Sequence, residues 1–190
     1  MGEIITVGDM MTDEYIAGIV DGEGSFTLQI SERKWKDGRT GIGLNPRVQI
    51  GFKYNTNEEV VLKEIQKRLR GGKIYFVNNG KSNAAIVFWT TNVADTIRFC
   101  EMLIPHLLIK KRQAKMLLES CKLIKTKIEG RAGTFLQKGT KFYSKDDYYK
   151  LVEISTTMNE GLQIQRWRNA KGRNKDYYLD IVDRMYDEVS

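Results

Sequence analysis

The first part of the chain changes its hydrophobic period once, from that of a helix to that of a strand. Residues 12–21 repeat apolar side chains at helical spacing, and Thr12 can cap this helix by accepting a backbone hydrogen bond. Gly22 and Gly24 follow, and glycines at this place favour a helix end. Residues 25–33 then alternate between apolar and polar, which predicts a strand with one buried face.

The pattern continues with a polar, glycine-containing stretch at 34–43, which we expect to be a loop. The elements predicted after it are a strand at 47–54, a helix at 58–69, a hairpin of strands at 73–77 and 84–90, and helices at 93–103 and 110–127. Pro105 separates the last two helices. The resulting order, α-β-β-α-β-β-α-α, predicts an α+β fold with an antiparallel sheet and helices on one face.

The remaining residues have a different character. A basic, glycine-rich loop at 130–141 precedes a helix capped by Ser144. Residues 166–175 hold five basic residues and no acidic one, and a last amphipathic helix is predicted at 176–188. We therefore expect two parts, a core domain at 1–128 and a C-terminal part of basic loop and helices at 129–190.

Composition and charge narrow the range of functions. The 190 residues carry 31 basic against 24 acidic side chains, a net charge of +7, which favours a polyanionic partner. No apolar run approaches the ~20 residues of a membrane span, and the N-terminus lacks a signal-peptide pattern. Cys100 and Cys121 have no metal-site spacing and are predicted to be free thiols. We expect an intracellular protein that is not secreted.

The outward face of the two first strands is polar without being acidic. Its side chains are Gln29, Ser31, Arg33, Arg47, Gln49 and Lys53. Such side chains can match base edges in the major groove of DNA, which admits a two-stranded ribbon. The alternative is an ordinary solvated sheet face. Solvated faces usually mix charges of both signs. The only acidic residue in these two strands, Glu32, is expected on the opposite face of its strand. The pattern therefore favours contact with DNA.

Two carboxylates stand at the end of the first helix. Asp21 and Glu23 flank Gly22, and carboxylates held near a backbone can bind the hard divalent cations that assist phosphodiester hydrolysis. The same stretch also partly matches a calcium-binding loop, but Phe26 occupies the position that requires glycine. His106 is the only histidine, so a histidine-based metal nuclease is not favoured, and His106 is expected to pack or to face solvent.

A resemblance to a known family rests on two segments. Residues 15–26, Tyr-Ile-Ala-Gly-Ile-Val-Asp-Gly-Glu-Gly-Ser-Phe, resemble the signature of the LAGLIDADG homing endonucleases and the strand that follows it. Residues 105–114, Pro-His-Leu-Leu-Ile-Lys-Lys-Arg-Gln-Ala, resemble the segment that opens a late helix in that family. The predicted order of elements is also that of the family, so the resemblance covers roughly residues 12–125. It implies the LAGLIDADG homing endonuclease fold, with a saddle-shaped sheet, plus C-terminal helices.

The resemblance also implies roles for individual residues. Glu23 matches the acidic metal ligand, Gly22 a position whose carbonyl oxygen reaches the metal, and Lys110 a basic residue near the scissile phosphate. A solvent-ordering glutamine often follows the second strand in the family. Here the chain departs from the pattern, and Asn55 is the candidate for that role.

The single copy of the signature implies a homodimer in which two such helices pair. The residues assigned to this interface are Ala17, Gly18 and Asp21. Of these, Asp21 is expected mainly to stabilise the helix junction. Further DNA contacts are expected from Tyr75, Lys171, Arg173 and Lys175.

The function implied is cleavage of both strands of a long, near-palindromic DNA target. The family uses Mg²⁺ or Mn²⁺, binds Ca²⁺ without cutting, and leaves 3′ overhangs. No membrane and no small-molecule substrate are expected. Members occur in introns of archaea, bacteria and organelles, so the cytoplasm or nucleoid of a prokaryote, or an organelle, would suit. The alternative is a non-catalytic relative, an RNA maturase or a DNA-binding regulator.

Overall fold

The structure, a computed structural model, describes residues 11–34, 36, 38–54, 56–78, 84–129, 143–158 and 173–187. The elements in chain order are α1 (Asp13–Glu23), β1 (Gly24–Lys34), β2 (Thr40–Lys53), α2 (Thr56–Leu69), β3 (Lys73–Asn78), β4 (Ala84–Trp89), α3 (Val93–Leu103), α4 (Lys111–Glu129), α5 (Lys145–Thr157) and α7 (Lys175–Asp187). The four strands form one sheet in the order β1-β2-β4-β3. The predicted α+β class and order of elements are confirmed.

The chain divides into two compact units that interleave in sequence. Unit 1 comprises Met1–Phe26 and Arg47–Leu118, and unit 2 comprises Thr27–Pro46 and Glu119–Ser190. The sequence suggested a single boundary near residue 128, because local patterns cannot show that the middle of the β1–β2 hairpin packs with the C-terminal helices.

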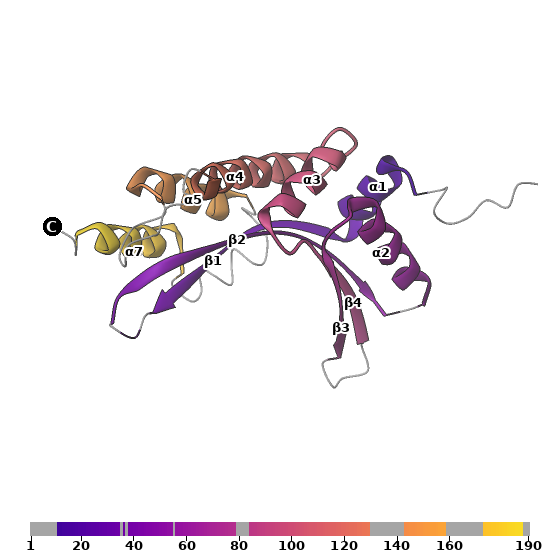
Figure 1. Ribbon diagram of the computed structural model, residues 1–190, viewed down its shortest axis with the longest axis horizontal. Helices are drawn as coiled ribbons and strands as arrows, with labels where there is room; N and C mark the ends of the chain where they lie inside the picture. The colour runs from indigo at the N-terminus through magenta and orange to yellow at the C-terminus, as the bar shows by residue number, and fades with distance from the viewer. Residues whose placement is uncertain are drawn as a thin grey trace, which may run out of the picture. The chain divides into compact units, whose positions relative to one another are not determined.

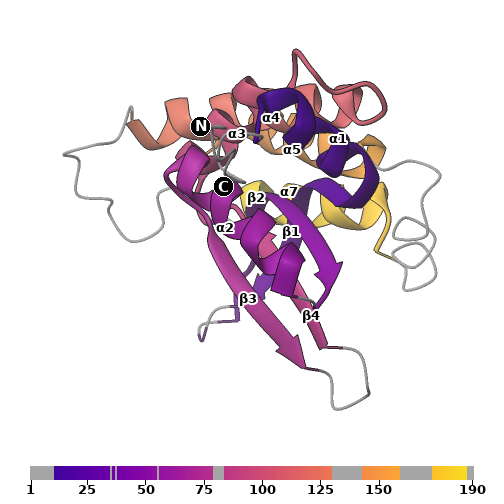
Figure 2. The same cartoon turned by 90° about the vertical axis from the view of Figure 1, so that its right-hand side faces the viewer.

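Unit 1 has a core between the β-hairpin and helices. Strand β4 pairs with β2 and with β3 in antiparallel fashion, so that Gln49 lies opposite Trp89, which lies opposite Lys73. Helix α2 packs on β3 and β4, and α1 packs on α3 (Figure 1, Figure 2). Phe88 and Phe99 are fully buried and stack with ring centroids 5.8 Å apart. Burial of such apolar rings is the main stabilising contribution to the unit.

A buried carboxylate joins the end of α2 to the start of α3 in unit 1. Asp95, only 5% exposed, accepts hydrogen bonds from the Gly72 backbone N–H at 3.0 Å and from Thr91 Oγ1 at 3.1 Å. It also pairs with Arg98. Asn92 caps α3 by accepting the Asp95 backbone N–H at 2.8 Å. These bonds satisfy a carboxylate that would otherwise be costly to bury.

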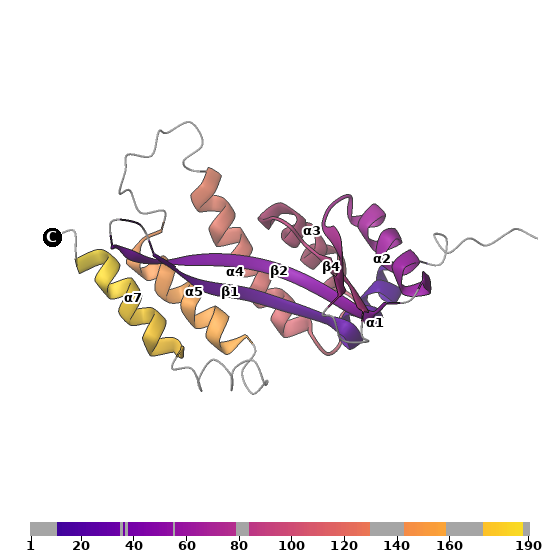
Figure 3. The ribbon, with the colours of Figure 1, turned by 90° about the horizontal axis from the view of Figure 1, so that it is seen from below.

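Unit 2 has a second hydrophobic cluster, in which strand residues pack against two helices. Helices α5 and α7 lie side by side (Figure 3). The buried members of the cluster are Ile30, Ile42, Tyr148, Val152, Tyr178, Ile181 and Val182. Ser155 Oγ donates to the Leu28 carbonyl oxygen at 2.5 Å, which fixes α5 on strand β1. Ser144 and Asp147 form a capping box at the start of α5, which confirms Ser144 as the cap.

Two predicted boundaries are wrong. Strand β2 already begins at Thr40, inside the stretch 34–43 that was expected to be a loop. Gly43 lies within this strand, and position 43 needs glycine because the side chains of Ser31 and Arg33 fill the space where a Cβ would be. Helix α1 does not stop at Gly22 but continues to Glu23, with Gly24 as its C-cap.

Two further expectations concern cysteines and membranes. Cys100 and Cys121 are buried free thiols, as predicted, and burial raises the pKa of Cys121 to about 12. Among the described residues, no helix is both long and apolar enough to cross a bilayer.

Candidate functional site

Helix α1 carries the first segment of the sequence motif and has one buried and one open side. Its buried residues are Ile16, Ala17 and Val20. Ala17 is fully buried by the chain's own packing, so it does not lie on a surface that a second subunit could reach. Gly18 and Gly22 are exposed, and a Cβ on either would meet no atom of the chain within 4 Å. The packing of this chain therefore does not explain why these two positions are glycine.

The C-terminal end of α1 is capped by a lysine from a distant part of the chain. Lys110 Nζ donates to the carbonyl oxygens of Val20 at 3.0 Å, Asp21 at 2.7 Å and Gly22 at 3.3 Å. The last carbonyls of a helix lack partners within it and carry partial negative charge. One ammonium group thus satisfies three of them and fixes the end of α1.

Asp21 provides the reciprocal cap. Its carboxylate accepts the backbone N–H groups of Leu108 at 2.8 Å, Ile109 at 3.2 Å and Lys110 at 2.9 Å. These residues directly precede α4, so the negative charge lies near the positive end of that helix. Asp21 therefore holds the turn that presents Lys110, which is the kind of junction role expected for it.

The two caps shift the pKa values of both side chains. Burial acts to raise the pKa of Asp21, but the backbone donors and Lys110 outweigh it, and the net pKa lies below its ordinary value. Burial lowers the pKa of Lys110, although Asp21 and Glu23 act in the opposite direction. Because Lys110 Nζ is bonded to the carbonyl oxygen of Gly22, the residue before Glu23, two of the predicted catalytic residues lie at the same end of α1.

The donors available to a metal at this place are oxygens. Glu23 is the last residue of α1 and is exposed, and the exposed Gly22 offers its carbonyl. A carbonyl oxygen has two lone pairs, so its bond to Lys110 does not exhaust it. Carboxylate and carbonyl oxygens suit Mg²⁺ and Ca²⁺. The described residues contain no group of three or more His, Cys, Asp or Glu that could hold a metal ion.

Large apolar side chains are exposed around this helix end. Leu108 is 87% exposed and Ile109 75% exposed, in the turn held by Asp21. Tyr15, in the first turn of α1, is 53% exposed. Exposed apolar side chains that are grouped mark an interaction surface. The sequence pattern did not single out Leu108 and Ile109, since an apolar run after Pro105 is equally typical of a buried segment.

In unit 1, a cluster of cationic and aromatic side chains lies on one face of the sheet. The Arg47 guanidinium lies 5.0 Å from the Trp89 ring centroid, and Tyr75 packs on the same indole with centroids 4.9 Å apart. Gln49 is the direct cross-strand partner of Trp89, and Lys53 follows on the same face. The sequence did not single out Trp89, because the alternation of β4 alone does not show that its indole lies on the same face as Arg47 and Tyr75.

In unit 2, the predicted polar residues of β1 alternate with buried ones. Ser31 Oγ donates to the Gly43 carbonyl at 3.4 Å, and Arg33 also lies over Gly43, whose Cβ would come 2.5 Å from the Arg33 Nε. Gln29 is half-buried and Arg33 exposed. The absence of a side chain at Gly43 thus sets where Ser31 and Arg33 lie on the strand surface.

The predicted basic residues of the C-terminal part differ in their surroundings. Lys175 Nζ forms an ion pair with Glu153 at 2.8 Å, whereas Arg173 is exposed and lines a cavity beside β1. Lys171 and Asn55 lie outside the described residues, so their assigned roles stay predictions. His106 is part-exposed, with Nδ1 3.2 Å from a Glu14 carboxylate oxygen.

A family model and a known protein each match more than half of this chain. The family model described as LAGLIDADG endonuclease matches residues 16–122. DNA endonuclease I-CvuI of Chlorella vulgaris is 30% identical over 114 residues, which are 60% of this chain and 66% of that protein, just under two thirds of its length.

Solved structures of similar fold cover nearly the whole chain. An archaeal intron-encoded homing endonuclease, I-Vdi141I, complexed with DNA, superposes with a TM-score of 0.62 at 22% identity, covering 91% of this chain and 95% of that one. I-CvuI in complex with the I-CreI target, in the presence of Mg and with DNA not cleaved, gives a TM-score of 0.63 at 17% identity, covering 91% and 93%. At these identities the likeness shows the shared fold.

Proposed function

Because the chain belongs to the LAGLIDADG endonuclease family, we propose that it is a site-specific homing endonuclease that cuts both strands of a long, near-palindromic DNA target as a homodimer. The observation that carries the proposal is the end of α1. There the exposed Glu23 carboxylate lies near Lys110, whose ammonium is fixed on the helix carbonyls. An acidic and a basic group at the same helix end support this proposal.

The oxygen donors fit a hard divalent cation, Mg²⁺ or Mn²⁺, with Ca²⁺ as a ligand that supports binding without cutting. The Glu23 carboxylate and the Gly22 carbonyl would hold it together with the same groups of a second copy. When bound, such an ion activates water and stabilises charge on the leaving oxygen. Similar folds have been solved with DNA in the presence of Mg and of Ca, which supports divalent metal use.

Lys110 would act on the phosphate without leaving its place. Its partly buried ammonium faces the end of α1, where Glu23 lies, and contributes positive charge near a scissile phosphate. Asp21 keeps Lys110 there through the backbone of the 108–110 turn. Hydrolysis that leaves 3′ overhangs is part of the proposal.

The homodimer is supported by the open side of α1. A Cβ at Gly18 or Gly22 would meet no described atom within 4 Å, so a second helix could approach closely there, and Leu108 and Ile109 expose apolar surface beside Asp21. Two copies related by a two-fold axis would bring two such helix ends together, one for each DNA strand.

DNA is proposed to lie on the polar face of the strands. The residues assigned to this contact are Gln29, Ser31 and Arg33 in unit 2, with Arg47, Gln49, Lys53 and Tyr75 in unit 1. The net charge of +7 and the DNA-bound state of the similar structures support duplex DNA as the partner.

The test uses Glu23→Gln, with Glu14→Gln on the same helix as the matched control. The substrate is a plasmid carrying the sequence in which the gene for this chain is inserted. We expect the unmodified protein and Glu14→Gln to cut in Mg²⁺ but not in Ca²⁺ or chelator. Glu23→Gln is expected to lose cutting while binding DNA in Ca²⁺ with near-normal affinity.

The outcomes distinguish a nuclease from a non-catalytic relative such as an RNA maturase. Sequencing of the cut ends shows whether 3′ overhangs are formed. If the unmodified protein binds the target but does not cut it, the nuclease proposal is refuted. Assisted splicing of the cognate intron that survives Glu23→Gln would instead support a maturase.

A further inference from the structure

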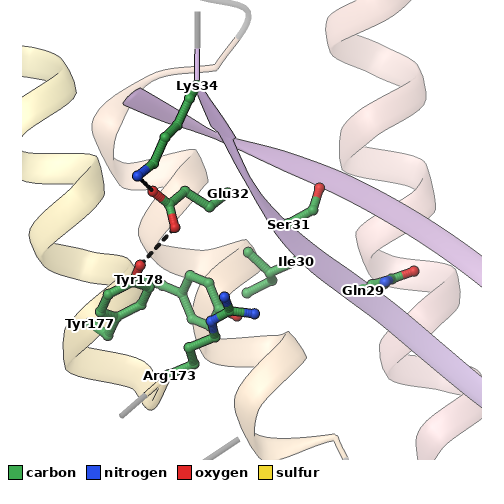
Figure 4. Close-up of a pocket in the computed structure, with 8 residues that line it drawn as sticks. All are labelled: Gln29, Ile30, Ser31, Glu32, Lys34, Arg173, Tyr177 and Tyr178. Carbon is green, nitrogen blue, oxygen red and sulfur yellow. Dashed lines mark hydrogen bonds and ion pairs between the residues drawn. The ribbon is translucent and has the colours of Figure 1, made fainter. Parts of the chain in front are cut away.

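A cavity of about 410 Å³ in unit 2 lies along strand β1, next to the first turn of α7. It is lined by polar and charged side chains, among them Glu32, Lys34, Arg173 and Tyr177, and by Gln29 and Ser31 (Figure 4). Strand β1 is at the end of the strand order, so it is an edge strand. Edge strands need cover, and here α7 contributes it.

Glu32 connects this edge strand to α7. Its carboxylate accepts a hydrogen bond from the Tyr177 hydroxyl at 2.8 Å and lies 3.4 Å from Lys34 Nζ. In Figure 4, Glu32 extends from the strand toward Tyr177, whereas Gln29 and Ser31 leave the strand on the other side. Glu32 therefore contacts the helix from the side of the strand opposite to that from which Gln29 and Ser31 extend.

The hydrogen bond favours one charge state of each partner. It lowers the pKa of Glu32 and raises the pKa of Tyr177, so at neutral pH the carboxylate is ionised and the phenol keeps its proton. Arg173, two residues before α7, is exposed, and its charge acts on both side chains. The Glu32–Tyr177 bond joins strand β1 to the first turn of α7, which begins two residues after Arg173.

We infer that Glu32 and Tyr177 are positioning residues, which hold Arg173 beside β1 so that its guanidinium binds a DNA phosphate next to the bases contacted by Gln29 and Ser31. The inference rests on the proposed function, because it requires DNA on this strand. An arginine held in place loses less conformational freedom on binding than one on a loose segment. Phosphate contacts of this kind fix the register in which neighbouring side chains meet the bases.

The test measures how the affinity for a mixed-sequence DNA duplex depends on salt. Each phosphate contact contributes about 0.9 to the slope of log affinity against log salt concentration. We expect Arg173→Gln and Tyr177→Phe each to reduce the slope by up to about that amount. The double variant should show the same slope as Arg173→Gln alone, because Tyr177 acts through Arg173.

Two matched comparisons distinguish positioning from general stability. Tyr149→Phe removes another phenol, one that donates to Asp183 of α7, and is expected to leave the slope unchanged. Glu32→Ala and Glu32→Gln change the charge equally, but only Gln keeps an acceptor for the Tyr177 hydroxyl. The Glu32→Gln slope should therefore stay close to that of the unmodified protein, and the Glu32→Ala slope should fall.

The inference is overturned if Tyr177→Phe keeps the unmodified slope, or if Tyr149→Phe lowers it as much. It is also overturned if Glu32→Ala and Glu32→Gln behave alike. If Tyr177→Phe does not fold, the Glu32 pair decides. Absence of any salt-dependent duplex binding by the unmodified protein would refute the proposed function instead, so the two failures are distinguishable.

Discussion

Replacing Gly18 by leucine separates the packing of one chain from the packing of two. Within the chain, a Cβ at Gly18 meets nothing within 4 Å, so the larger side chain has room. Glycine inside a helix is about 1 kcal/mol less favourable than good helix formers. The fold of a single chain should therefore be unharmed or slightly stabilised by Gly18→Leu.

The proposed dimer responds in the opposite direction. If two α1 helices approach at Gly18, a leucine overpacks the contact, and such overpacking costs about 1–3 kcal/mol at each site. The two-fold axis presents every substitution twice, so about 2–6 kcal/mol is lost per dimer. That loss weakens the dimer Kd by about 30-fold or more.

Sedimentation equilibrium over a range of protein concentrations measures the dimer Kd, and urea unfolding at low concentration measures the stability of the single chain. Gly24→Ala is the contrasting control, because its Cβ would come 2.7 Å from both the side chain and the carbonyl oxygen of Val20. It should destabilise the single chain. A Gly18→Leu protein that dimerises as tightly as the unmodified one would refute the assignment of this helix face.

Two further predictions concern stability. Asp95→Ala leaves the Gly72 N–H without its acceptor and Arg98 without its partner, and urea unfolding should show a loss of about 3 kcal/mol; a loss below about 1 kcal/mol would contradict the structural role of Asp95. The pKa of Asp21 lies below its ordinary value of 3.8, so its ionised form stabilises the fold above that pH, and this contribution disappears as the pH falls through the folded pKa. The urea midpoint of the unmodified protein should therefore fall more steeply with acid than that of Asp21→Asn, and parallel curves would argue against the Asp21 cap.

Much of the fold could be predicted where sequence signals are local. The bounds of α3 at Val93–Leu103 follow from the cap Asn92 before it and Pro105 after it, and the structure has these bounds. The start of β2 could not be predicted in this way, because Gly43 looks like a loop residue on its own. Position 43 needs glycine because Ser31 and Arg33, on the neighbouring strand β1, occupy the space of a Cβ. The local sequence pattern does not show that these residues are neighbours.

The candidate site also has features that the local sequence predicts and features that depend on residues far apart in the sequence. The motif around Glu23 predicted the acidic residue, and the second segment predicted Lys110. The sequence could not show that the Lys110 ammonium is bonded to the carbonyl oxygens at the end of α1, since 87 residues separate it from Glu23. Trp89 was missed for a related reason, because its contact with Arg47 depends on the register between β2 and β4.

The interleaving of the two units has a consequence for protein engineering. The middle of the β1–β2 hairpin, Thr27–Pro46, belongs to the same compact unit as α5 and α7, although more than seventy residues of unit 1 intervene. Ile30 and Ile42 of the strands share one apolar cluster with Tyr148 and Tyr178. A chimaera that transplants these strands into a relative must therefore carry the C-terminal helices with them. A graft of the strands alone would separate Gln29, Ser31 and Arg33 from the apolar core that supports their strand.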